Sequence, residues 1–140
     1  MNWEERSASS PYQTAVAVRQ SIQAGQLTEA DAGIEELIDA LARSERRALK
    51  SQLARLMAHV LKWMAQPELR NRSWVATIHG ARDEIKEIQT ETPSLNDEVI
   101  RGMWDKCFEL AKAQAEAETD REIKLSGMTW EQVFSTEYRI

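Results

Sequence analysis

The sequence contains few residues whose types and spacing would support metal chemistry. Two histidines, His59 and His79, and one cysteine, Cys107, are ligand types that zinc prefers. They could converge from three helices, but no two of them stand at a ligand spacing such as i, i+4. Neither histidine follows a glutamate by three residues, which is the pattern of di-iron helical bundles. We therefore expect no metal site and no cofactor.

Signatures of nucleophilic catalysis and of phosphate loops are also missing. Five scattered glycines form neither a Walker loop nor a dinucleotide fingerprint, and no GxSxG motif occurs. Carboxylates are paired at i, i+4, as at Glu35 with Asp39 and Asp83 with Glu87, a spacing typical of a solvated helix face. The aromatic neighbours of Cys107 indicate a buried and inert thiol. We predict no catalytic residue, and an enzyme of unknown reaction stays an alternative.

Charge is distributed unevenly along the chain. Residues 43–86 hold ten Lys or Arg against four Asp or Glu, whereas the remaining residues hold eight against nineteen. One interpretation is that acidic helices cover the basic segment. The other is that basic side chains face outward and receive phosphates or an acidic partner. The candidate partner-binding residues are then Arg46, Arg47, Lys50, Arg55, Arg70 and Arg72.

The composition predicts which elements hold these side chains. With 140 residues, 42% of them hydrophobic and 29% charged, the chain is long enough for one folded domain. Only five Gly and three Pro occur, so helix formers dominate and the class is all-α. We expect a single bundle of five or six helices over residues 11–140, preceded by a flexible lead over residues 1–10 in which Trp3 is free to contact another molecule.

Features of the N-terminal residues and of the apolar runs predict a cytoplasmic protein. Residues 1–10 carry charges and no apolar run, so we expect no secretory signal. The longest apolar stretch, residues 56–65, is interrupted by His59 and Lys62 and is too short to cross a bilayer. A single cysteine excludes an internal disulfide and fits a reducing compartment.

Caps and apolar spacing predict the helices of the first half. Ser10 and Pro11 begin a helix over residues 11–24, with Gly25 as its stop. A second helix begins at Thr28, and a third ends at Pro67; whether these two run on through Ser44 is left open. The core-facing residues we expect are Tyr12, Val16, Val18, Ile22, Ile34, Leu37, Ile38, Leu41, Leu49, Leu53, Leu56, Val60 and Trp63.

The second half is read in the same way. A fourth helix begins near Ser73, with Ile78 and Ile85 on its buried side and Gly80 placed for close packing against a large neighbour. A long fifth helix follows Pro93, and its apolar pattern fades over residues 111–122, so we expect its last turns to project into solvent or to fray. A capping box predicts a short final helix over residues 129–135 that docks on the domain.

Several short motifs resemble a known family. They occur in a fixed order: SERR at residues 44–47, HVLKW at 59–63, QPE at 66–68, RNRSW at 70–74, PSL at 93–95 and TWEQVF at 129–134. The chain closely resembles a bacterial family catalogued as domain of unknown function twenty-nine, over nearly its whole length. The resemblance implies a compact helical bundle and no activity, cofactor or catalytic residue. Thr14 and Ala42 stand where the family's pattern has tryptophan and glycine.

The sequence favours a binding role over an enzymatic one. We expect a small cytosolic adaptor or regulatory protein that recognises a protein partner through its surface, with self-association included. A nucleic-acid-associated protein using residues 43–86 is the alternative. It is disfavoured because an isoelectric point near 5.2 opposes approach to phosphates.

Overall fold

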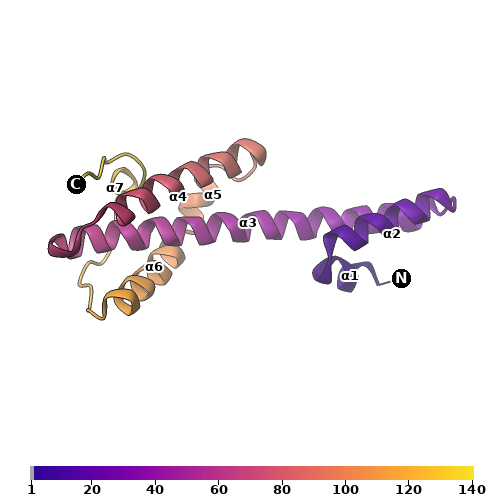
Figure 1. Ribbon diagram of the computed structural model, residues 1–140. Coiled ribbons are helices and arrows are strands. Elements are labelled where there is room, and N and C mark those ends of the chain that lie inside the picture. The colour runs from indigo at the N-terminus through magenta and orange to yellow at the C-terminus, as the bar shows by residue number, and fades with distance from the viewer. Residues whose placement is uncertain (1) are drawn as a thin grey trace. The chain divides into compact units, whose positions relative to one another are not determined.

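The computed structural model describes residues 2–140, apart from the side chains of Ala8 and Ser9, and no strand occurs among them. The predicted all-α class and the capped C-terminal helix are confirmed. The elements are α1 (Trp3–Ser9), α2 (Pro11–Gln23), α3 (Leu27–Ala65), the 3-10 helix η1 (Pro67–Leu69), α4 (Arg72–Glu91), α5 (Asp97–Gly102), α6 (Trp104–Thr119) and α7 (Trp130–Phe134) (Figure 1).

Contacts between residues group the chain into two compact units. The N-terminal unit is Met1–Arg47, and the C-terminal unit is Ala48–Ile140. The sequence predicts one bundle over residues 11–140, whereas the contacts divide that range at residues 47 and 48. Helix α3 contributes residues to both units.

In the N-terminal unit, α1 corrects the prediction of an unstructured lead. Asn2 caps this helix by accepting from the backbone N–H of Glu5, and Trp3 is only 5% exposed. Gly33 explains how the indole fits against α3, because a Cβ at this position would stand 2.9 Å from the Trp3 ring. Trp3 is therefore a core residue and is not free to bind a partner.

Helix α2 begins and ends as its sequence predicts. The Ser10 side chain accepts from the Gln13 backbone N–H, Pro11 occupies the first turn, and Gly25 takes a left-handed φ of 75°. Its buried side differs from the prediction. Val18 is buried with small residues, whereas Tyr12 is 79% exposed. The buried cluster of this unit is small and consists of Trp3, Ala17, Val18 and Ala30.

The open question at Ser44 is settled by α3, which runs as one helix through that position. Neither glycine nor proline occurs between Gly33 and Pro67, so no residue there favours a break. The predicted core stripe of its first turns is wrong in part, because Ile34, Ile38 and Leu41 are exposed.

The C-terminal unit contains the larger core. In Figure 1 the C-terminal part of α3 lies between α4 and α6. The predicted buried face of this part of α3 is confirmed, because Leu49, Leu53, Leu56 and Val60 are fully buried. The α4 prediction also holds, with Ile78, Ala81, Ile85 and Ile88 buried. Gly80 is an exception, because a Cβ there would meet nothing within 4 Å and no close neighbour explains the glycine.

The predicted fifth helix is divided into two. Asn96 caps α5, and the backbone departs from helical geometry at Met103 before α6 begins. The expectation that the end of this segment projects into solvent is wrong, because Ala111 and Ala115 are fully buried. The final helix α7 has both hydrogen bonds of a capping box, between Thr129 and Gln132. Val133 of this helix is buried in the main core cluster, which confirms the docking of the tail.

Candidate functional site

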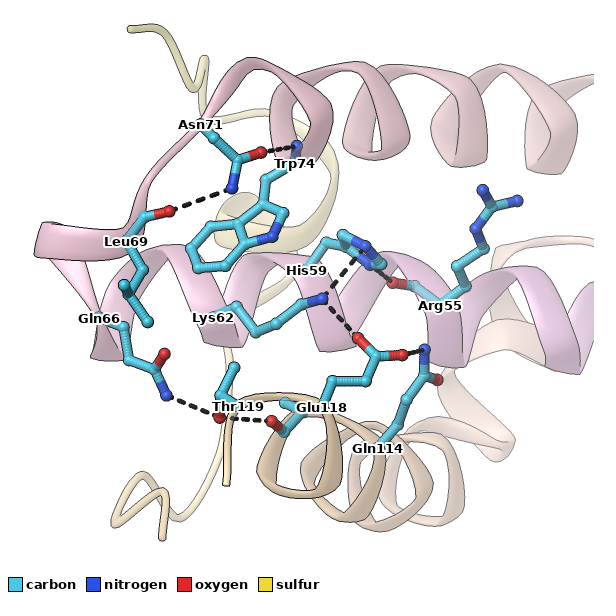
Figure 2. A network of polar contacts seen from close by, with 11 residues as sticks. Arg55, His59, Lys62, Gln66, Leu69, Asn71, Trp74, Gln114, Glu118 and Thr119 are labelled. Carbon is cyan, nitrogen blue, oxygen red and sulfur yellow. Dashed lines mark hydrogen bonds and ion pairs between the residues drawn. The ribbon is translucent and has the colours of Figure 1, made fainter. Parts of the chain in front are cut away.

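A polar cluster lies inside the C-terminal unit, where α3, α4 and α6 meet (Figure 2). His59 and Lys62 stand three residues apart on α3, so they project from neighbouring turns of the same face. Trp74 comes from the first turns of α4, and Glu118 from the last turn of α6. We call His59, Lys62, Trp74 and Glu118 the Lys62 cluster.

Lys62 is the centre of the cluster and is only 4% exposed. Its Nζ lies 2.6 Å from Glu118 Oε2, 3.4 Å from His59 Nε2 and 5.3 Å from the centroid of the Trp74 ring. A buried ammonium is costly unless it is paired. The carboxylate, the imidazole and the indole face together supply that pairing.

His59 is held as a neutral imidazole. Its Nδ1 lies 2.9 Å from the Arg55 carbonyl oxygen, so Nδ1 carries the hydrogen and Nε2 is left to accept from Lys62. Burial lowers the pKa of His59, and the nearby Lys62 charge lowers it further. The hydrogen bond to Arg55 and the Glu118 carboxylate act in the opposite direction without reversing the shift.

Glu118 is ionised, and each of its carboxylate oxygens accepts a hydrogen bond. One carboxylate oxygen accepts from Lys62, and the other accepts from Gln114 Nε2 at 2.9 Å. Both hydrogen bonds lower the pKa of Glu118, and the one from Lys62 has the larger effect. Just past the end of α3, the buried Gln66 donates to Thr119 Oγ1 at 2.9 Å. The end of α6 is thus bonded both to α3, through Lys62, and to the residue that follows α3.

This chemistry suits a structural role better than a catalytic one. The imidazole has no free nitrogen to act as a base, and the ammonium is held by a carboxylate and cannot attack as a free amine. Burial raises the pKa of the Cys107 thiol, whose Sγ donates to the Lys50 carbonyl oxygen at 3.7 Å. Within residues 2–140, no group of three His, Cys, Asp or Glu side chains is placed to hold a metal ion.

The motif residues next to this cluster also serve the fold. Arg70 Nε donates to the Trp63 carbonyl oxygen at 2.9 Å, and its guanidinium lies 4.5 Å from the centroid of the Trp63 ring. Asn71 caps α4 by accepting from the Trp74 backbone N–H at 3.0 Å. Glu68 pairs with Arg121. The QPE and RNRSW motifs therefore close the turn between α3 and α4.

The six candidate partner-binding residues do not form one group. Arg46 and Arg47 belong to the N-terminal unit, where both are exposed on α3. Arg47 lines a hollow of about 240 Å³ together with Ser7, Pro11, Ala40, Arg43 and Ser44. The other four, Lys50, Arg55, Arg70 and Arg72, belong to the C-terminal unit, and the contacts of Arg70 with Trp63 occupy it within the fold.

A second surface feature lies on α3 within the N-terminal unit. Four large hydrophobic side chains, Leu27, Ile34, Ile38 and Leu41, are exposed there. Their spacing of seven, four and three residues places them on one face of the helix. We call these four residues the apolar stripe. Elsewhere in the described chain the exposed large hydrophobic residues are Tyr12, Val16, Ile22, Leu69, Leu110 and Ile140.

Sequence reasoning missed both features as sites. Lys62 and Glu118 are 56 residues apart, and no local spacing links them. The only available signal was a lysine inside an otherwise apolar helical run. Three residues of the apolar stripe, Ile34, Ile38 and Leu41, are predicted as core from the sequence, because periodicity indicates an apolar face and not what covers it.

The fold and these two features define an all-helical protein with an internally satisfied polar cluster and an exposed apolar helix face. The chain belongs to the family described as domain of unknown function DUF29, which it matches over residues 12–139. No match was found among curated proteins or among solved structures. Within the described residues, no helix has the length and apolar character needed to cross a membrane.

Proposed function

We propose that this protein is a non-enzymatic adaptor or regulatory protein that binds a protein partner through the apolar stripe. One observation carries the proposal. Of the ten exposed large hydrophobic side chains among residues 2–140, seven lie between Tyr12 and Leu41, in the N-terminal unit. Exposed apolar groups in such a concentration are typical of interaction surfaces.

The energetics of burial support this role. Each Å² of apolar surface removed from water contributes roughly 25 cal/mol, so covering four large side chains contributes several kcal/mol. The polar side chains of the Lys62 cluster, by contrast, are engaged with one another. The N-terminal unit thus supplies the contact surface, and the C-terminal unit supplies a stable scaffold. We place this activity in the bacterial cytoplasm, on the support of the family resemblance and of the lone, buried Cys107.

Affinity recovery of the tagged protein from its own cells tests the proposal. Wild type, Ile38→Glu and Leu110→Glu are compared, since Leu110 is 42% exposed in the C-terminal unit and serves as a matched control. We expect a protein that accompanies the wild type and Leu110→Glu and is lost with Ile38→Glu.

Two outcomes would contradict the proposal. The first is that Ile38→Glu recovers the same proteins as wild type. The second is that nucleic acid accompanies the wild type and is lost when Arg46 and Arg47 are changed to Glu. That result would favour the nucleic-acid alternative, and the association would weaken steeply with salt.

A further inference from the structure

We propose that a hollow of the N-terminal unit binds the phosphate monoester group of a small molecule. We call it the arginine hollow, and it is lined by Ser7, Pro11, Ala40, Arg43, Ser44 and Arg47. Arg43 lies two residues beyond Leu41, which puts it on the far side of α3 from the apolar stripe. The inference therefore goes beyond the proposed function, because it concerns a different surface and a different class of ligand.

The spacing of residues along α3 explains where the hollow forms. Gly33, Ala40 and Arg47 follow one another at intervals of seven residues, so they share one face of the helix. Gly33 and Ala40 are small and buried, and the ring of Trp3 packs against Gly33. Beyond Ala40 the same face carries the long side chains of Arg43 and Arg47. Close packing therefore gives way to a hollow that these arginines line.

The charge of the hollow favours an anion. Arg43 and Arg47 are one turn apart and exposed, and like charges at this spacing repel each other. None of the six lining residues is acidic. Within the described part of the chain neither guanidinium forms an ion pair, and Asp39, one turn before Arg43, does not pair with it. Two positive charges are thus left for a ligand to neutralise.

Ser7 adds an unused hydroxyl at the same place. This residue is 2% exposed, and its Oγ has no hydrogen-bond partner among the described residues. Buried hydroxyls are nearly always hydrogen-bonded, so an unbonded one indicates a partner from outside the chain. Ser44 is exposed and supplies a second hydroxyl to the lining. An oxygen of a bound anion would accept from such donors.

The charges and donors select a phosphate monoester. At neutral pH this group carries a charge of about −1.5 to −2 and three acceptor oxygens, and an arginine can bind it through two parallel hydrogen bonds. A carboxylate or a phosphodiester carries a single negative charge and would balance only one guanidinium. The volume of about 240 Å³ is smaller than the roughly 300–1,000 Å³ of pockets for drug-sized ligands, which favours a small phosphorylated molecule.

NMR chemical-shift titrations of the full chain test the ligand and its place. Glycerol 3-phosphate is added at constant ionic strength, and we expect saturable shifts of backbone amides concentrated in residues 7–12 and 40–47. Acetate and dimethyl phosphate, which carry one negative charge, should bind at least about tenfold more weakly, because they leave one arginine without its charge-assisted contact.

Substitutions in the hollow test which residues bind. Arg43→Gln and Arg47→Gln should each weaken glycerol 3-phosphate binding by about tenfold or more. Arg46→Gln is the matched control, since Arg46 is exposed beside Arg47 but does not line the hollow, and it should bind as wild type does. Ser7→Ala should weaken binding by about two- to tenfold without lowering the melting temperature of the ligand-free protein, because the lost hydroxyl has no partner there. Circular dichroism verifies that each variant remains helical.

Several results would overturn the inference. If glycerol 3-phosphate does not bind, or binds equally well to the variants at Arg43, Arg47 and Arg46, the hollow is not a phosphate site. If acetate or dimethyl phosphate binds as tightly, the ligand is not a monoester. A single-stranded oligonucleotide or a phosphoserine peptide that binds far more tightly would assign the arginines to a macromolecule. The Ile38-dependent recovery of a protein is a separate measurement, so the proposed function stands or fails independently.

Discussion

Replacing Glu118 by glutamine should destabilise the C-terminal unit through the charge of Lys62. The substitution keeps the shape of the side chain and one oxygen acceptor, but it removes the negative charge that lies 2.6 Å from the Lys62 ammonium. That ammonium is nearly inaccessible to water, and it would retain only the neutral His59 and the Trp74 ring as partners. The variant therefore isolates the electrostatic contribution of the pair.

The exposures of the two partners set the expected magnitude. Breaking a fully buried ion pair costs about 3–5 kcal/mol, whereas an exposed pair contributes about 0–1 kcal/mol. The Lys62 side chain is 6% exposed, but that of Glu118 is 44% exposed, so water screens one side of the interaction. We expect a loss of about 1–2 kcal/mol in the free energy of unfolding.

Urea unfolding followed by tryptophan fluorescence measures this loss, with Glu109→Gln as the control, an exposed glutamate on the same helix. Lys62→Met and the double variant complete a cycle that gives the coupling energy between the two side chains. The double variant should recover much of the stability, because methionine leaves no buried charge. If Glu118→Gln and Glu109→Gln behave alike, Lys62 does not need its carboxylate partner, and the argument fails.

Further expectations concern pH, packing and the tail. Because burial lowers the pKa of His59 in the folded protein, the unfolded chain binds a proton at a higher pH than the folded one does. Stability should therefore fall as the pH drops below about 6.5. His59→Gln should flatten this part of a profile of melting temperature against pH. Gly33→Ala should lower the free energy of unfolding by roughly 1–3 kcal/mol through steric overlap. Gly80→Ala should raise it by about 1 kcal/mol, and thermal melts measure both changes. Leu53→Ala should cost roughly 2–5 kcal/mol in urea unfolding. Removal of residues 128–140 should lower the unfolding midpoint and increase dye binding to exposed apolar surface; a truncated protein of equal stability would contradict the docked tail.

The helices of the C-terminal unit could be predicted because their signals are local. The buried apolar residues around Leu53 recur with a regular helical period, and Pro67 ends α3. The capping box at Thr129 is complete in the sequence. The N-terminal unit was predicted less well. The apolar pattern around Ile38 is as regular as that around Leu53, but in this unit the neighbouring helix covers a different face of α3.

The Lys62 cluster depended on a contact that local patterns do not encode. Glu118 lies in a segment rich in alanine, and alanine contributes a weak apolar signal. The buried Ala111 and Ala115 nonetheless allow α6 to pack closely, and this packing brings Glu118 to Lys62. Trp3 was missed for a related reason, because its site depends on the absence of a side chain at Gly33.

The small buried cluster around Trp3 also has a consequence for motion. Few buried apolar groups oppose opening of the N-terminal unit, so its backbone amides should exchange with solvent through local opening well before those of the C-terminal core. A partner that binds only the closed form slows this exchange by mass action. The slowing increases with the ratio of the free partner concentration to the dissociation constant. Exchange protection in α2 and in the first turns of α3 would then report the fraction of molecules that are bound.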